Sequence, residues 1–166
     1  MGSLKTLKRM LVDDRKSIPA TIMTKLIRKN ITNILSDKAF VTLRYKTIFH
    51  RKLDLKNPKT FNEKLQWIKL YDRNPQYTMM VDKYEVRKFV SEKIGEEYLF
   101  PCLGVWNSPE EIDYDSLPEK FVLKCTHDSG SLQICDKANL DKAQINQKFK
   151  KKLKFNMFWW GREWPY

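Results

Sequence analysis

Two short apolar runs separated by a polar stretch constrain the fold most strongly. They lie in FVLKCTHDSGSLQICDK, residues 121–137, where Phe121 to Cys125 and Leu132 to Cys135 are predicted to be strands. The five residues between them, His127 to Ser131, are polar and include a glycine, which is typical of a turn. The segment therefore predicts a β-hairpin, and its loop is either an ordinary turn or a loop built to hold a ligand.

Helical patterns precede the hairpin. Near the N-terminus, Leu4, Leu7 and Leu11 recur at helical spacing among basic residues, which predicts an amphipathic helix over residues 4–12. That helix either packs on the protein's own core or lies on a membrane surface. Two further helices are expected. One starts at Pro19 and runs through Ile22, Leu26 and Ile27 toward Leu35, and the other is capped by Ser36 and carries Phe40, Leu43 and Thr47.

Thr60 and Glu63 form a capping-box pattern, which predicts a helix that ends at residues 72–75. The next helix is expected from about Asp82 to Ile94, with Lys83 in its first turn and Gly95 in a left-handed conformation after its end. Helices followed by strands and a final helix indicate an α+β fold, with an N-terminal helical region at 1–59 and a second region at 60–166. The helix after Thr60 is expected to have an apolar face of Phe61, Leu65, Ile68 and Tyr71, and the helix at 82–94 one of Val86, Phe89 and Val90. Further along the chain, we expect a strand at 103–106, a loop at 107–120 and a basic helix at 140–155.

The charge of the chain favours an anionic partner. Its 32 Lys and Arg residues outnumber 20 Asp and Glu residues, for a net charge of +12. A nucleotide, an acidic polymer and a membrane surface would all match this charge, but no signature of nucleic-acid binding accompanies it. The chain has neither a membrane-spanning apolar run nor a signal peptide, so we expect a cytoplasmic protein with at most peripheral membrane contact.

Three cysteines without C-x-x-C spacing argue against a disulfide framework or a zinc cluster. Cys125 and Cys135 fall in the predicted strands and are expected to be buried free thiols. The opening MGSLKT also matches a short N-acylation pattern, which fits many unrelated sequences by chance.

Strand alternation places Lys124 on the same face as Val122 and Thr126. This lysine either lies on a solvated sheet face or points toward an anion. The adjacent loop supports an anion, because Ser129, Gly130 and Ser131 offer hydroxyls, amides and the backbone freedom of glycine. His127 could bond a phosphate or transfer a proton, but a bond to a nearby backbone carbonyl is an equal alternative. No second histidine lies nearby, so no metal site is predicted.

Four long segments resemble the TupA-like ATP-grasp family, whose members are named for teichuronopeptide biosynthesis and are often labelled glycosyltransferases of polysaccharide clusters. The resemblance covers roughly residues 36–166. The segments are TFNEKLQWIKLYDRNPQY, VDKYEVRKFVSEKIGEEYL, LPEKFVLKCTHDSGS and NMFWWGREWPY.

The resemblance implies an ATP-dependent ligase, in which ATP phosphorylates a carboxylate and an amine attacks the acyl phosphate. By position, Lys83 and Lys124 resemble the two lysines that neutralise phosphate charge in this family. The segment from Thr126 to Ser131 resembles the glycine-containing hairpin that closes over the phosphates. The family implies a second glycine where this chain has Ser131. The implied nucleotide-binding set is Lys83, Lys124, Thr126, His127, Ser129, Gly130 and Ser131.

The same resemblance implies that ATP and Mg²⁺ are the cofactors, with the magnesium ligands in a later subdomain. Family members continue beyond the WPY segment, so we expect an incomplete chain that is inactive alone. The aromatic stretch FNMFWWGREWPY is expected to be exposed and prone to self-association. Two other functions stay open: a glycosyltransferase, and a non-catalytic basic module that binds an acidic polysaccharide, a peptide precursor or a membrane surface.

Overall fold

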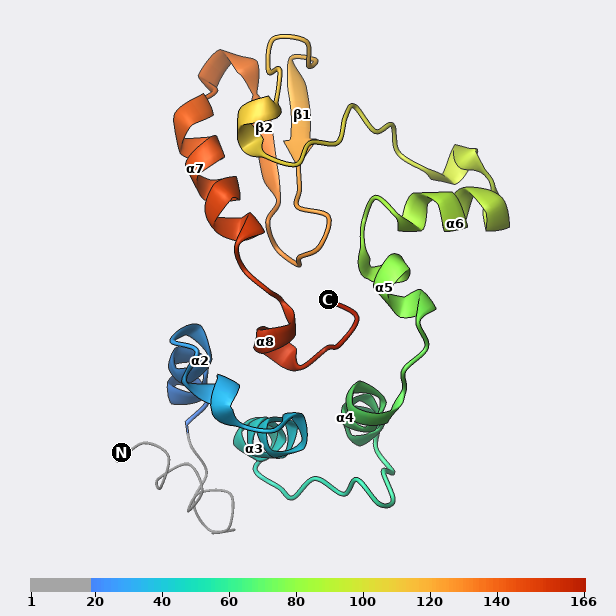
Figure 1. Ribbon diagram of the computed structural model, residues 1–166, viewed down its shortest axis with the longest axis vertical. Helices are drawn as coiled ribbons and strands as arrows, with labels where there is room; N and C mark the ends of the chain where they lie inside the picture. Colours follow the sequence, from blue (N-terminus) through green and yellow to red (C-terminus); the bar gives the residue numbers. More distant parts are fainter. Residues whose placement is uncertain (1–18) are drawn as a thin grey trace. The chain divides into compact units, whose positions relative to one another are not determined.

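Helices and one β-hairpin form the part of the chain that the structure, a computed structural model, describes, which is residues 19–166 (Figure 1). These residues divide into two compact units. Unit 1 contains residues 19–74 and 158–164, and unit 2 contains residues 75–157 and 165–166. The predicted helix at 4–12 and the N-acylation pattern lie outside the described residues. The α+β class is confirmed at this level: helices together with a small two-stranded antiparallel sheet.

Unit 1 begins with a helix that is shorter than predicted. Helix α2 (Ala20–Arg28) follows Pro19 as expected, but it ends before Asn30, which adopts a left-handed conformation with φ 58°. Asparagine tolerates this conformation better than most residues, so the chain turns here. The short 3₁₀ helix η1 (Ile31–Ile34) covers the rest of the stretch that the apolar pattern predicted to be one helix.

Helix α3 (Asp37–Phe49) confirms the cap and the stripe that the sequence predicts. The hydroxyl of Ser36 accepts a hydrogen bond of 3.3 Å from the amide of Ala39. The three predicted stripe residues are buried, and they join a core that α2 and the following loop complete. This core consists of Met23, Ile27, Phe40, Val41, Leu43, Tyr45 and Leu53, with Thr47 buried nearby.

Helix α4 (Phe61–Tyr71) has the predicted capping box but not a buried apolar face. The side chain of Thr60 accepts from the Glu63 amide, and the Glu63 carboxylate accepts from the Thr60 amide at 2.8 Å. Leu65 is half-buried, but the other residues of the predicted stripe are exposed: Phe61 is 74%, Ile68 42% and Tyr71 47% accessible. Leu70, which lies outside that stripe, packs against the unit 1 core. The stripe pattern thus predicts the helix, although not which side of it is covered.

Helix α8 (Phe158–Gly161) returns to unit 1, where Arg162 anchors it. The Arg162 side chain is 1% exposed and donates to the carbonyls of Thr32 and Leu35 at 3.0 and 3.3 Å. Its guanidinium lies over the Trp159 ring, 4.3 Å from the centroid. Phe155 and Asn156 are exposed, but residues 157–166 are half-buried or buried, so the expectation of an exposed aromatic end is wrong for that stretch.

Unit 2 begins with helix α5 (Gln76–Val81), which is not among the predicted helices, and α6 (Val86–Ile94). The predicted helix from Asp82 starts four residues late, because the Asp82 carboxylate accepts the amides of Tyr84 and Glu85 at 2.8 and 3.0 Å and forms a turn. Lys83 therefore lies in this turn and not in the helix. Gly95 has a φ of 108°, as a glycine after a helix end can. The 3₁₀ helix η2 (Glu96–Tyr98) follows.

The predicted hairpin is present, formed by β1 (Lys120–Leu123) and β2 (Gln133–Asp136). The strands are antiparallel, with Phe121 opposite Cys135 and Val122 opposite Ile134. Helix α7 (Lys142–Leu153) lies beside the hairpin (Figure 1) and contributes Ile145 and Phe149 to a second core. The other members of this core are Tyr114, Leu117, Phe121, Leu123, Cys125 and Cys135.

Residues 103–106 do not form the predicted strand, because no other segment of residues 19–166 pairs with them. The stretch from 107 to 120 is largely loop, as predicted, with short 3₁₀ helix η3 (Pro109–Glu111) inside it. A further short 3₁₀ helix, η4 (Lys137–Asn139), links β2 to the loop before α7. Among the described helices, none combines the length and apolar character that crossing a bilayer requires.

Candidate phosphate-binding loop

The hairpin loop is attached to the turn that contains Lys83. The Lys83 amide donates to the carbonyl of Thr126 at 3.1 Å. The Lys83 ammonium donates to the carbonyls of Cys125 at 3.0 Å and Thr126 at 3.2 Å, and also to the carbonyl of Asp128. The structure therefore brings Lys83 and the loop together, as the predicted site requires, but through the backbone of the loop.

Asp82 strengthens the same attachment. Its carboxylate accepts the amides of Tyr84 and Glu85, and it interacts with the Thr126 hydroxyl. Partial burial by itself would raise the pKa of Asp82, but these hydrogen bonds and the charge of Lys83 outweigh it and lower the pKa below its usual value. The Asp82 carboxylate is thus held in its charged form, and the Thr126 hydroxyl is engaged by Asp82 within the protein.

Asp128 and Ser131 are bonded to each other inside the loop, and both are only 2% exposed. The Ser131 hydroxyl donates to Asp128 Oδ1 at 2.5 Å and accepts the Cys125 amide at 2.7 Å. Ser131 is therefore a structural residue in this arrangement, although the sequence grouped it with the nucleotide-binding residues. Asp128 was missed as a site residue. Its signal was the spacing of an aspartate and a serine three residues apart, a pattern of local side-chain bonding in turns.

The tip of the loop is open. Ser129 and Gly130 are exposed, and Gly130 has a φ of 95°, which a residue with a side chain rarely adopts. A Cβ built on Gly130 would meet no atom within 4 Å. Lys124 is exposed just before the loop, and its ammonium has no hydrogen bond or ion pair within residues 19–166. The backbone of the tip and the Lys124 ammonium can therefore meet a ligand from solvent.

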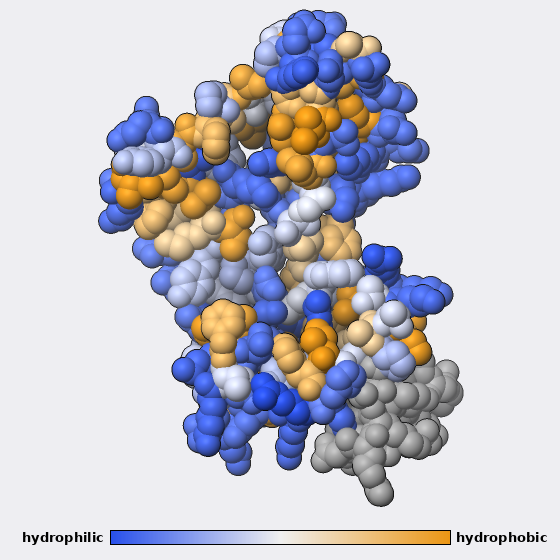
Figure 2. Space-filling model, turned by 180° about the vertical axis from the view of Figure 1, so that it is seen from behind, coloured by the Kyte–Doolittle hydropathy of each residue, from blue (hydrophilic) through white to orange (hydrophobic). Residues whose placement is uncertain are grey.

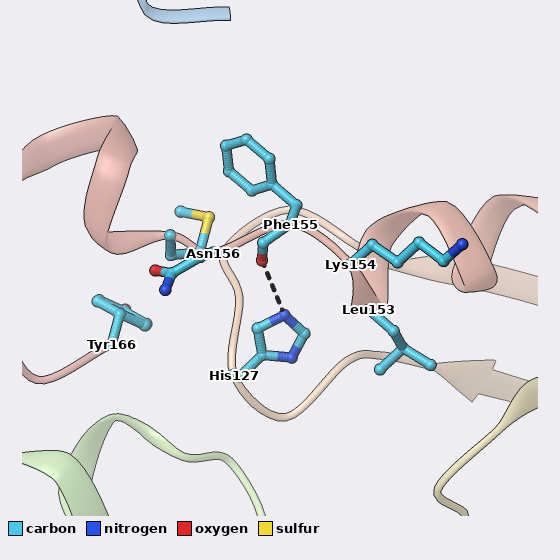
Figure 3. Close-up of a pocket in the computed structure, with 7 residues that line it drawn as sticks. His127, Leu153, Lys154, Phe155, Asn156 and Tyr166 are labelled. Atoms are coloured by element: carbon cyan, nitrogen blue, oxygen red, sulfur yellow. Dashed lines mark hydrogen bonds between the residues drawn. The ribbon is translucent and has the colours of Figure 1, made fainter. Parts of the chain in front are cut away.

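His127 takes the alternative that the sequence left open, a bond to the backbone. Its Nε2 lies 3.2 Å from the carbonyl oxygen of Phe155, and because a carbonyl only accepts, this nitrogen carries the hydrogen. Figure 3 shows the carbonyl directed at the imidazole while the Phe155 ring points away. The histidine forms part of an open pocket of about 270 Å³, which is lined by His127, Leu153, Lys154, Phe155, Asn156, Met157 and Tyr166.

The outer face of the hairpin is apolar next to Lys124. Val122 and Ile134, which are paired across the strands, are 48% and 72% exposed, and Leu132 is 50% exposed. In the rear view of Figure 2, apolar surface is visible over the part of unit 2 that carries the hairpin. The opposite face is the buried one: Phe121, Leu123 and Cys125 point into the core, as the alternation predicts. Cys125 and Cys135 are buried free thiols, as predicted, and burial raises the pKa of both.

The described residues do not form a metal site. Within residues 19–166, His, Cys, Asp and Glu side chains do not gather in groups of three or more that could hold an ion. The carboxylates near the loop are already engaged, because Asp82 bonds a turn and Asp128 bonds Ser131.

Comparison with known families identifies one relationship. A family model described as TupA-like ATPgrasp matches residues 63–166, a span that begins at the capping-box glutamate of α4 and contains the Lys83 turn, the hairpin and α8. Neither a curated protein nor a solved structure matches the chain.

Proposed function

Because the chain belongs to the TupA-like ATP-grasp family, we propose that it binds ATP and that its hairpin loop contacts the phosphates. In this proposal the protein serves as an ATP-dependent ligase that joins a carboxylate to an amine. The loop acts as a lid on the phosphates, and Lys124 supplies the positive charge beside it. The proposed setting is the cytoplasm, in the synthesis of a bacterial cell-surface polymer such as a teichuronopeptide.

The observation that carries the proposal is the contrast between the base and the tip of the loop. The base is fixed by the Lys83 turn and by the bonds of Ser131, while Gly130 at the tip is exposed and surrounded by free space. A phosphate needs amides that are close together and accessible, next to a cation with free donors. The Lys124 ammonium is such a cation, on the residue that follows the end of β1 and leads into the loop.

The described residues fit the phosphates of ATP, but they do not fit magnesium. An exposed glycine amide, the Ser129 hydroxyl and the Lys124 ammonium are suitable donors to a phosphate oxygen. The two nearest aspartates are bonded within the protein, and no group of metal ligands occurs among residues 19–166. The role we propose for these residues is therefore to bind and orient phosphate and to exclude water from it.

The substrates are proposed from charge and family alone. A net charge of +12 suits an acidic acceptor, such as an acidic polysaccharide or peptide precursor. Two other functions make different predictions for ligand binding. A glycosyltransferase would bind a sugar nucleotide more tightly than ATP, and a non-catalytic basic module would bind an acidic polymer and neither nucleotide.

Calorimetric titration of the purified chain separates these three functions. We expect ATP to bind with an affinity that exceeds that of UDP-glucose, with and without added Mg²⁺. Tighter binding of UDP-glucose would favour the glycosyltransferase. Binding of an anionic polysaccharide without measurable binding of either nucleotide would contradict the ligase proposal.

A further inference from the structure

We propose that Lys83 positions the hairpin loop through its backbone carbonyls and is not a direct phosphate ligand. This inference rests on the proposed function and assigns a different role to each of the two lysines of the site. Lys83 sets the position of residues 125–128, and Lys124 is left as the lysine that contacts phosphate.

The inference rests on the hydrogen bonds that the Lys83 ammonium donates. A lysine ammonium has three N–H groups and no acceptor. The Lys83 ammonium donates to three carbonyls, those of Cys125, Thr126 and Asp128. All three donors are therefore engaged, so a phosphate could bond the Lys83 ammonium only by displacing one of these three hydrogen bonds.

The three acceptors belong to one short stretch, so the ammonium controls its shape. Carbonyls of consecutive extended residues point in opposite directions along a strand. Here the carbonyls of Cys125, Thr126 and Asp128 converge on a single nitrogen, immediately after β1 ends at Leu123. A cation at this point offsets the repulsion between the carbonyl dipoles and holds the backbone in a bend.

A second set of contacts fixes the lysine itself. The Lys83 amide donates to the Thr126 carbonyl, and Asp82 interacts with the Thr126 hydroxyl. The turn at residues 82–85 is in turn held by the Asp82 carboxylate. Lys83 is thus bound to the loop through both its main-chain amide and its side-chain ammonium. Lys124, by contrast, has no hydrogen bond or ion pair within the described chain.

Arginine provides the decisive substitution. A guanidinium retains the charge and binds phosphate well, but its donors lie in one plane and cannot converge on three carbonyls as an ammonium does. Lys83→Arg should therefore damage the loop even though it preserves the charge. Lys124→Arg should leave the loop intact and retain most of the ATP affinity, which makes it the matched control.

Amide hydrogen exchange of the nucleotide-free protein measures loop position without any ligand. The reporter is the Cys125 amide, which is bonded to the Ser131 hydroxyl, together with the amides of residues 127–131. In Lys83→Arg and Lys83→Met we expect exchange of the Cys125 amide to rise by about tenfold or more. In Lys124→Arg and Lys124→Met it should match the wild type. Unchanged protection of the Phe149 amide in α7 would establish that unit 2 stays folded.

The opposite pattern would overturn the inference. If Lys83→Met leaves the exchange of the loop unchanged but weakens ATP binding, and Lys83→Arg restores that binding, Lys83 contacts phosphate directly. Failure of the wild type to bind ATP would contradict the proposed function but not the exchange result. The two ideas can therefore fail separately.

Discussion

Ser131 and Asp128 are joined by a hydrogen bond of 2.5 Å inside the hairpin loop, and each side chain is only 2% exposed. The Ser131 hydroxyl also accepts the Cys125 amide at 2.7 Å. One hydroxyl therefore satisfies a buried carboxylate and a buried amide at the same time. The family resemblance implies a glycine at position 131, and a glycine could make neither bond.

Replacement of this hydroxyl should destabilise unit 2. In Ser131→Ala, the Cys125 amide and Asp128 lose a partner while they stay buried, which costs about 1–3 kcal/mol. Urea unfolding followed by circular dichroism would measure the loss. Ser129→Ala is the control, because Ser129 is exposed and its replacement should change the free energy of unfolding by less than about 0.5 kcal/mol. Equal effects of the two substitutions would show that the Ser131 bonds contribute little.

The attachment of the loop should weaken in acid through Asp82. The pKa of Asp82 is lowered in the folded protein, so the charged carboxylate stabilises the fold above the pKa of the unfolded chain, and this contribution is lost as the pH falls below about 4. The difference in thermal midpoint between the wild type and Asp82→Asn should be largest near pH 7 and should shrink in acid. Because the other carboxylates titrate in both proteins, their contributions cancel in this difference, and the remaining pH dependence belongs to Asp82. A difference that is constant from pH 7 to pH 3 would contradict this role.

Arg162 should stabilise unit 1 strongly, although it carries a charge. In Arg162→Met, the carbonyls of Thr32 and Leu35 lose a buried charged donor, and the stacking over Trp159 is lost. We expect a loss of about 3 kcal/mol in the free energy of unfolding, measured by urea unfolding with tryptophan fluorescence. The control is Arg73→Met, because Arg73 is exposed and lies over Trp164 at 5.3 Å. If both variants lose less than about 1 kcal/mol, Arg162 is not the anchor of the C-terminal segment.

Local patterns in the sequence predicted local structure well. The Ser36 cap, the capping box at Thr60 and the hairpin with its buried face all depend on residues a few positions apart, so their physics is visible in the sequence. The strand predicted at 103–106 failed for the opposite reason. A strand requires a partner, and the residues themselves cannot indicate whether another segment provides one.

In the candidate site, too, local features could be predicted from the sequence and long-range contacts could not. Gly130 and the exposed Lys124 could be located from the pattern of a strand and a polar turn. The role of Lys83 could not, because its three carbonyl partners lie 42 to 45 positions further along the chain. Arg162 likewise bonds residues 127 and 130 positions away. Contacts of this length depend on the fold, and a lysine or an arginine in a sequence does not reveal them.

The most direct test of the proposed function compares two lysines on the same face of one hairpin strand and its extension. Lys124 lies at the loop, while Lys120 lies at the far end of β1, 79% exposed and 3.9 Å from Asp136. Calorimetric titration should show that Lys124→Met weakens ATP binding by about 5- to 150-fold, which corresponds to about 1–3 kcal/mol, with an unchanged fold. Lys120→Met should bind ATP like the wild type. Equal ATP affinity in the wild type and Lys124→Met would contradict the assignment of this loop to phosphate binding.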